Sequence, residues 1–170
     1  LLKKMRDFAP KTALTRLEER ASVIPVPLEA HWFRNPPPVD GPLRILWNHR
    51  WEYDKAPERF FDALTALQDD NHPFELYVVG QSFQTQPACF GSAQKSLSHR
   101  IKQWGYLDSA EAYRELLPKM DLVVSTALHE FQGLSVLEAA ASGCRVLVPK
   151  RLAYPEWFQD SALYPSYPEE

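Results

Sequence analysis

The stretch "DLVVSTALHEFQGLSVLEAAASGCRVLVP", residues 121–149, contains two short apolar runs separated by a helical pattern. The runs 121–126 and 145–149 are continuous and rich in valine and leucine, which is typical of strands buried on both faces. Residues 134–142 are apolar almost all round, which predicts a buried helix. A strand, a helix and a second strand in this order predict two parallel strands of one sheet.

The same alternation of strands and helices extends over most of the chain. Further strands are expected at 44–48, 75–80, 104–107 and, more weakly, 162–165. Helices are expected at 57–69, 96–103 and 109–117, the last with a capping signal at Ser109. This pattern predicts an α/β fold, a Rossmann-like three-layer α/β/α arrangement around a mostly parallel sheet.

The amino-terminal part has a different character. Residues 1–22 read as helical with a break at Pro10, and residues 25–42 contain six prolines. Because proline cannot pair in a central strand and stiffens an extended chain, we expect a linker at 25–42. The predicted organisation is therefore a tail of a missing amino-terminal domain at 1–24, the proline-rich linker, and a ligand-binding domain at 43–170. A long surface loop of one domain is the alternative.

Composition narrows the class of protein. The chain has 170 residues, of which 45% are hydrophobic and 24% charged, with a formal net charge of -3. These values are ordinary for a globular domain and lack the basic excess typical of nucleic-acid or membrane surfaces. The two cysteines, Cys89 and Cys144, stand far apart. We therefore expect no disulfide framework, no zinc site, and a reducing, cytoplasmic location.

Polar residues cluster directly after the predicted strands, at 48–55, 81–86, 125–133 and 150–156. The carboxyl ends of parallel strands lie at one edge of a sheet, where open α/β folds bind their ligands. The sequence therefore predicts a ligand site at this edge.

Several enzyme classes are excluded by missing partners in this stretch. His129-Glu130 begins a zinc-protease pattern, but Gly133 occupies the position of the second histidine. Gly133-Leu134-Ser135 begins a nucleophile elbow, but Leu137 stands where the second glycine is needed. The glycine-rich fingerprints of dinucleotide and P-loop enzymes do not occur.

The same residues suit a nucleotide. Glu138 is the one charge in an apolar helix, so it needs either an ion-pair or amide partner or the hydroxyls of a ligand such as ribose. Gly133 precedes that helix, and the amides of Leu134 and Ser135 at its start favour either simple capping or a bound phosphate.

Two cations follow the first strand of the ligand-binding domain. Arg50 and Lys55 lie in the loop that leads into the helix at 57–69. They are either solvated surface charges or a guanidinium and an ammonium arranged for a diphosphate. Their expected position on the same rim as Gly133 favours the diphosphate.

These motifs resemble a known family. Glu130 and Glu138, separated by seven residues in "EFQGLSVLE", and the Arg50/Lys55 pair are similar to the signatures of retaining GT-B glycosyltransferases. The segments "ILWNHRWEYDKAPE", "GYLDS", "STALHEFQGLSVLEA" and "RLAYPE" resemble more closely the glycosyltransferase-like family that contains the tRNA-queuosine α-mannosyltransferases. The likeness covers about residues 20–165 and implies the carboxy-terminal, donor-binding half of a GT-B fold.

The resemblance implies a role for each cation and for the helix start. Arg50 and Lys55 would neutralise the donor diphosphate, together with the amides of Leu134 and Ser135 that follow Gly133. The leaving phosphate, held by these groups, can itself accept the proton of the acceptor. This chemistry needs no metal ion or other cofactor.

The resemblance also implies the remaining contacts of the donor. Glu138 would hold the ribose hydroxyls, Glu130 would bind hydroxyls of the transferred sugar, and Tyr106 and Leu107 would pack on the base. Glu130, Arg50 and Lys55 are the residues expected to act in catalysis.

The implied function is retaining transfer of a hexose, namely mannose from GDP-mannose, onto queuosine in tRNA. The acceptor tRNA would be bound mainly by the missing domain, so the isolated chain is expected to be inactive. Two alternatives stay open. One is the same fold acting on another nucleotide sugar with a lipid or glycan acceptor. The other is a non-catalytic module that binds sugar nucleotides, against which the presence of both glutamates argues.

Overall fold

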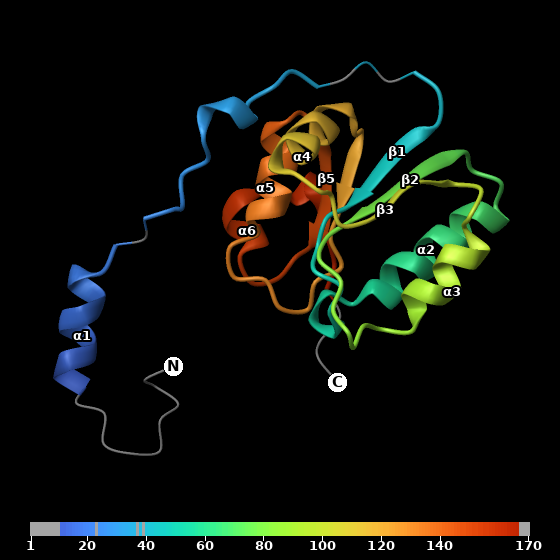
Figure 1. Ribbon diagram of the computed structural model, residues 1–170. Helices are drawn as coiled ribbons and strands as arrows, with labels where there is room; N and C mark the ends of the chain where they lie inside the picture. Colours follow the sequence, from blue (N-terminus) through green and yellow to red (C-terminus); the bar gives the residue numbers. More distant parts are fainter. Residues whose placement is uncertain (1–10, 23, 37, 39, 167–170) are drawn as a thin grey trace.

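The computed structural model describes residues 11–22, 24–36, 38 and 40–166, and a parallel sheet forms its centre (Figure 1). The sheet has six strands in the order β3-β2-β1-β4-β5-β6, and each neighbouring pair is parallel. The strands are β1 Leu43–Trp47, β2 Phe74–Val79, β3 Ile101–Gly105, β4 Leu122–Val124, β5 Arg145–Pro149 and β6 Leu163–Tyr164. The predicted α/β class with a parallel sheet is confirmed.

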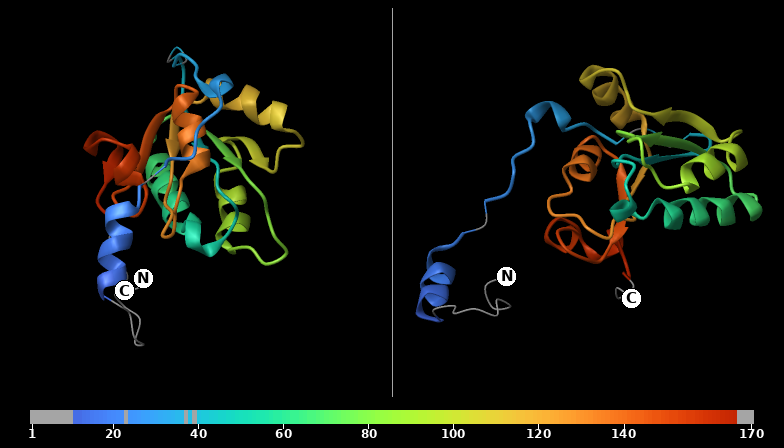
Figure 2. Two further views of the ribbon diagram at one scale, coloured as in Figure 1. Left: turned by 90° about the vertical axis from the view of Figure 1, so that its left-hand side faces the viewer. Right: turned by 60° about the horizontal axis from the view of Figure 1, so that its bottom comes forward.

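Helices cover both faces of the sheet, as Figures 1 and 2 show. One face carries α2 Pro57–Asp69 and α3 Cys89–Ser96, and the other carries α4 Ala110–Leu116 and α5 Leu134–Ala141. The short helix α6 Tyr154–Trp157 follows β5, and α1 Lys11–Arg20 lies away from the sheet. Single 3-10 turns complete the fold at Ala30–Trp32, Tyr53–Lys55, Leu117–Lys119 and Asp160–Ala162.

Alternation along β1 builds the two cores. Ile45 and Trp47 pack with Phe60 of α2 and Phe90 of α3 on one face. Leu46, between them, packs with the opposite core against α5 and the turn after α4. Because successive side chains of a strand point to opposite faces, a run that is apolar at every position is needed here.

The helix predicted at 96–103 is wrong. The helix ends at Ser96, and β3 begins at Ile101, where it pairs with Leu76 of β2. Leu97 is buried and caps the helix, and the backbone amide of Arg100 donates to its carbonyl in the turn between the two elements. The spacing of Leu97 and Ile101 imitated a helical face, but these residues reach the core from a helix end and from a strand.

Other boundaries also shift. The strand expected at 104–107 starts and ends earlier, at Ile101–Gly105, and the pattern did not predict the short helix α6. The capping signal is confirmed, since the Ser109 hydroxyl accepts from the Ala112 amide at 3.0 Å. Of the helical stretch expected at 1–22, Lys11–Arg20 forms α1, and residues 1–10 lie outside the described residues.

Part of the proline-rich segment packs on the domain. The Arg34 amide donates to the Ala141 carbonyl at 2.9 Å, and the Ser142 hydroxyl donates to the Trp32 carbonyl at 3.3 Å. The Trp32 ring meets Tyr113 of α4 edge-on, with ring centres 5.8 Å apart. We call residues 29–36 the strap. Its role as an interdomain linker stays a prediction.

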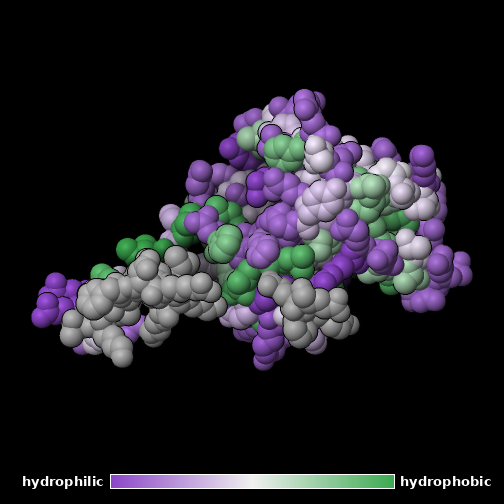
Figure 3. All heavy atoms as spheres, turned by 90° about the horizontal axis from the view of Figure 1, so that it is seen from below, coloured by the Kyte–Doolittle hydropathy of each residue, from purple (hydrophilic) through white to green (hydrophobic). Residues whose placement is uncertain are grey.

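The face seen from below mixes polar and apolar side chains, with polar ones over most of its area (Figure 3). Within the described ranges, no helix combines the length and the apolar character needed to cross a membrane.

Candidate nucleotide-sugar site

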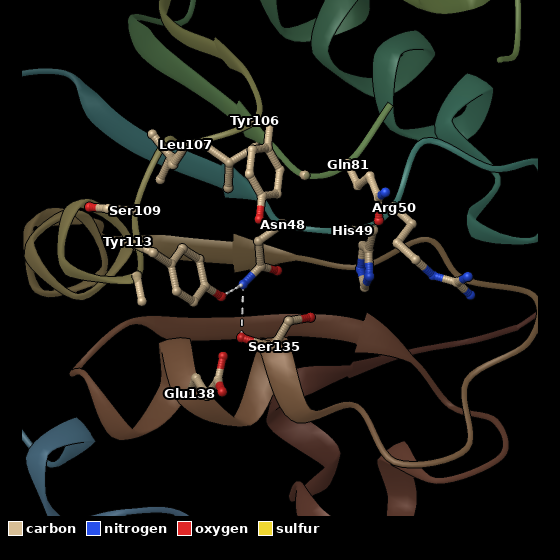
Figure 4. Close-up of a pocket in the computed structure, with 13 residues that line it drawn as sticks. Asn48, His49, Arg50, Gln81, Tyr106, Leu107, Ser109, Tyr113, Ser135 and Glu138 are labelled. Atoms are coloured by element: carbon tan, nitrogen blue, oxygen red, sulfur yellow. Dashed lines mark hydrogen bonds between the residues drawn. The ribbon is translucent and has the colours of Figure 1, made fainter. Parts of the chain in front are cut away.

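A pocket of about 390 Å³ opens at the sheet edge where β1, β2 and β3 end (Figure 4). Its walls come from the residues at these strand ends and from α4 and α5 with the turn before α4. The lining residues are Asn48, His49, Arg50, Val79, Gly80, Gln81, Tyr106, Leu107, Ser109, Ala110, Tyr113, Ser135 and Glu138. The pocket therefore lies where the pattern of polar residues predicted a ligand site, and its volume suits a small ligand.

Five of the predicted site residues line this pocket: Arg50, Tyr106, Leu107, Ser135 and Glu138. They come from three separate parts of the chain, and the parallel sheet brings them together. Tyr106 is 69% exposed, so its side chain is accessible at the rim of the pocket. An aromatic ring of this kind can stack on a nucleobase.

Glu138 projects from α5 toward the pocket beside Tyr113 (Figure 4). Burial raises the pKa of the Glu138 carboxyl above its ordinary value, and the neighbouring Tyr113 hydroxyl offsets part of that rise. Burial likewise raises the pKa of Tyr113, and the Glu138 charge adds to the effect. The carboxylate thus faces a hydroxyl and open space, which leaves room for the hydroxyls of a ligand.

Arg50 leaves the end of β1 at the opposite side of the pocket from Glu138 (Figure 4). Its guanidinium lies 3.0 Å from the Glu52 carboxylate, and its side chain is 56% exposed. An exposed ion pair of this kind contributes little free energy. A bound phosphate can therefore compete with Glu52 for the guanidinium.

The other predicted residues, Lys55, Glu130, Gly133 and Leu134, lie outside the pocket lining. Lys55 is buried, and its ammonium donates to the His129 carbonyl at 2.7 Å and lies 3.0 Å from Asp54 and 3.4 Å from Glu130. An ammonium has three N–H groups, so these three oxygens use all of them. The structure thus joins Lys55 and Glu130 in one cluster, which we call the Lys55 cluster.

Glu130 holds the loop that precedes α5. Its Oε1 accepts from the amides of Phe131, Gln132 and Gly133 at 3.2, 3.4 and 3.0 Å. Burial raises the pKa of this carboxyl, but the Gly133 amide and the Lys55 charge outweigh burial and keep that pKa below its ordinary value. Glu130 is therefore ionised at neutral pH.

Gly133 starts α5 in the left-handed conformation, with φ +71° and without a side-chain cap. A Cβ atom at this position would lie 3.1 Å from the Tyr154 ring, so packing as well as conformation favours glycine here. The first amides of a helix lack partners within the helix and attract anions. The helix start faces the same edge of the sheet as the pocket.

Sequence reasoning missed Asn48 and Tyr113 as site residues. The Asn48 amide donates to the Tyr113 hydroxyl at 2.9 Å and to the Ser135 carbonyl at 2.8 Å, joining β1, α4 and α5 across the pocket floor (Figure 4). The signal for Asn48 was present, because it opens the polar run 48–55. Tyr113 gave no signal, because only the tertiary fold brings it to Glu138. His49 and Gln81 lie in the polar runs 48–55 and 81–86, so their signal was present as well, and Ser109 was predicted only as a helix cap.

The described residues contain no group of three or more His, Cys, Asp or Glu side chains arranged to hold a metal ion. Arg50 is a cation in the pocket lining, and Lys55 is a cation in the adjoining cluster.

Comparisons with known proteins agree with this architecture. A family model described as "Glycosyl transferases group 1" matches residues 29–163. The chain is 38% identical over 122 residues to the tRNA-queuosine alpha-mannosyltransferase of Drosophila melanogaster. That match covers 72% of this chain and 32% of the relative, so the chain spans about a third of the relative's length.

Solved structures show the same fold. The carboxy-terminal domain of the group 1 glycosyl transferase LpcC from Francisella tularensis matches with a TM-score of 0.62 and 22% identity, over 77% of this chain and 70% of that one. The pneumococcal O-GlcNAc transferase GtfA, solved with UDP and GlcNAc, matches with a TM-score of 0.62 and 13% identity, over 79% of this chain and 27% of that one. The architecture is thus the carboxy-terminal half of a GT-B fold.

Proposed function

The chain belongs to the group 1 glycosyl transferases, and from this premise we propose that it forms the donor-binding half of a retaining hexosyltransferase. The proposed reaction moves mannose from GDP-mannose onto queuosine in tRNA. Mannose and queuosine follow the name of the Drosophila relative, and GDP follows the family resemblance of the motifs. The observation that carries the proposal is the pocket at the sheet edge, which Arg50 and Glu138 line from opposite sides.

The proposed donor lies along the edge of the sheet where the strands end, with its nucleotide in the pocket and its sugar toward the Lys55 cluster. The base packs on Tyr106 and Leu107, and the ribose hydroxyls donate to Glu138. The diphosphate lies toward Arg50 and the start of α5, and the transferred sugar reaches Glu130. The support for this order is that Glu138 and Arg50 lie on opposite sides of the pocket, while Glu130 lies beyond the pocket lining.

In the proposed chemistry the bond between the anomeric carbon and the diphosphate breaks. A bond from that carbon to the acceptor oxygen forms on the same face of the sugar, and the proton of the acceptor passes to the departing phosphate oxygen. Arg50 and the amides of Leu134 and Ser135 stabilise the negative charge that develops on the phosphate. A metal ion is not required in this scheme, because preplaced donors supply the stabilisation.

Lys55 has a less direct part in this scheme than the resemblance implies. Its ammonium already faces three protein oxygens, so a contact with the diphosphate requires the exchange of one of them. Its position in the cluster supports a second action, which is to hold the Glu130 carboxylate in place for the sugar.

The acceptor is assigned to the rest of the enzyme. The chain carries a formal net charge of -3, whereas binding of tRNA phosphates depends on lysine and arginine. We therefore propose that the part of the enzyme equivalent to the unmatched two thirds of the Drosophila relative makes most tRNA contacts, in the cytoplasm. Mass spectrometry of tRNA incubated with this chain and GDP-mannose should show no mannosylation, and detectable product would contradict this division.

Calorimetric titration of the chain with GDP and with UDP tests the donor. GDP is expected to bind more tightly than UDP, with the same affinity in the presence of EDTA. UDP is the relevant competitor because GtfA, which shares the fold, was solved with UDP. Tight binding of UDP without binding of GDP would overturn the GDP-mannose proposal, and a loss of GDP affinity in EDTA would overturn the metal-free scheme.

A further inference from the structure

His49 is a buried polar residue of the pocket to which neither the motifs nor the resemblance gave a role. It follows Asn48 at the end of β1, is 4% exposed, and lines the pocket beside Arg50 (Figure 4). Its Nε2 atom is buried, and no described residue forms a hydrogen bond with it. A buried nitrogen without a partner is unfavourable, so such atoms in native proteins call for an explanation.

Packing explains the burial of His49 but not its free nitrogen. The imidazole meets the Trp47 ring edge-on, with ring centres 5.1 Å apart. Gly80 crowds the backbone, since a Cβ atom there would lie 1.9 Å from the His49 carbonyl oxygen. The residue is thus held in place from two sides, while its Nε2 forms no hydrogen bond within the part of the chain that the structure describes.

The surroundings of His49 join the two parts of the site. His49 lines the pocket with Arg50. The charges of Glu130, Lys55 and Asp54 in the Lys55 cluster shift its pKa. Burial, assisted by Lys55, lowers the pKa of His49 to about 4, although Glu130 and Asp54 act in the opposite direction. The imidazole is therefore neutral at physiological pH, with one N–H donor and one acceptor nitrogen.

We propose that His49 is a further donor-binding residue, whose Nε2–H donates to a phosphate oxygen of the nucleoside diphosphate next to Arg50. The inference rests on the proposed function, because it places the diphosphate at this end of the pocket. A phosphate oxygen satisfies the buried nitrogen, and a neutral donor adds a directed hydrogen bond where Arg50 supplies charge. Asn48 on the preceding position serves the pocket floor instead, through Tyr113 and Ser135.

Two variants of similar length separate the hydrogen bond from packing. His49→Gln keeps an N–H donor near the position of Nε2, whereas His49→Met fills the same space without a donor. His31→Met is the matched control, because the His31 Nε2 is also buried without a partner but belongs to the strap outside the pocket lining. Thermal unfolding of each variant reports whether it is folded.

Affinities for GDP and for guanosine are then measured by calorimetry on the folded variants. His49→Met should weaken GDP binding about tenfold or more, as expected for a lost hydrogen bond to a charged group. His49→Gln should restore most of that affinity, His31→Met should match the wild type, and guanosine, which has no phosphate, should bind all four proteins equally.

Equal GDP affinity of the His49→Met, His49→Gln and wild-type proteins would overturn the inference. An equal loss for GDP and guanosine in His49→Met would also overturn it, since the contact would then not involve phosphate. If the wild type itself does not bind GDP, the proposed function fails as well. The first two results leave the proposed function standing.

Discussion

At the scale of single residues, Arg50 is held by Glu52 before any ligand binds. The guanidinium lies 3.0 Å from the Glu52 carboxylate in an exposed pair, so a phosphate has to replace that carboxylate. Arg50→Ala should weaken GDP binding by roughly 1.5–3 kcal/mol, the scale of a hydrogen bond to a charged group. Glu52→Gln should strengthen it by about 0.2–1 kcal/mol, because the competing exposed pair is lost.

Calorimetric titration of the two variants with GDP tests whether Arg50→Ala weakens binding and Glu52→Gln strengthens it. Unchanged GDP affinity in Arg50→Ala would show that Arg50 does not contact the phosphates. Weaker binding in Glu52→Gln would show that Glu52 assists the ligand and does not compete with it.

Glu130 can still accept hydrogen bonds from a sugar, although it already accepts three from the loop before α5. Oε1 accepts from three amides, whereas Oε2 faces only Lys55 among the described residues, and a carboxylate oxygen can accept more than one hydrogen bond. Glu130→Gln should therefore spare GDP binding but lower the affinity for GDP-mannose relative to GDP roughly threefold to tenfold.

The affinity ratio of GDP-mannose to GDP, measured in wild type and in Glu130→Gln, decides this point. A ratio that does not change would mean that Glu130 only organises the loop before α5.

At the scale of elements, the strap and α4 support the pocket from behind. Trp32 contacts Tyr113, and the Tyr113 hydroxyl accepts from Asn48 at the pocket floor. Trp32→Ala should lower the free energy of unfolding by about 1–3 kcal/mol, because it removes a partly buried aromatic ring. It should also weaken GDP binding by less than tenfold, since Tyr113 loses a neighbour but keeps its hydrogen bond.

Phe33→Ala is the matched control, because Phe33 belongs to the same strap and is 63% exposed. Its effect on denaturant unfolding should stay within about 0.5 kcal/mol. If Trp32→Ala behaves like Phe33→Ala, the strap does not stabilise α4.

Elements were predicted well where burial decides the pattern and poorly where a turn does. The runs around 44–48 and 75–80 are largely apolar because both faces of the sheet are covered there, and each forms a strand. The run 145–149 also forms a strand, although Leu147 in it is 38% exposed. The helix predicted at 96–103 is wrong, because Leu97 and Ile101 have helical spacing but belong to different elements, with Leu97 buried at the end of α3 and Ile101 partly buried in β3. The local sequence does not distinguish a segment that forms one helix from a segment that is divided between a helix end and a strand.

At the scale of the whole molecule, His49 should make the free energy of unfolding decrease as the pH is lowered from 6.5 to about 4. The pKa of His49 is lowered from 6.5 to about 4 in the folded chain. Between these values the unfolded chain binds more protons, so acidification favours unfolding. The free energy of unfolding should decline by up to about 1.4 kcal/mol per pH unit from this residue as pH falls through the window.

Denaturant unfolding at pH 7, 6, 5 and 4 tests this dependence, with His49→Gln as the comparison. The variant should show a flatter profile in the window. It should still lose stability at lower pH, where Asp121 titrates, because Arg44 holds the pKa of that carboxyl below its ordinary value. Parallel profiles of variant and wild type would contradict the assignment to His49.

Part of the site could be predicted from the sequence, because the order of strands in the sheet decides which residues come together. Arg50 could be predicted because it is a charge directly after a strand, and Glu138 because it is the one charge in an apolar helix. The sheet brings both residues into one pocket. Lys55 and Glu130 were expected beside them, but the fold pairs them in an adjoining cluster. Tyr113 depends on distant packing, which the linear order of residues does not reveal, whereas His49 lies in the polar run 48–55 and was not recognised there.

A structure of the chain bound to GDP-mannose would show where each part of the donor lies. We expect the ribose hydroxyls on Glu138, the diphosphate beside Arg50 and His49, and the mannose toward Glu130. A nucleotide bound with its phosphates away from Arg50, or with its ribose away from Glu138, would contradict this arrangement.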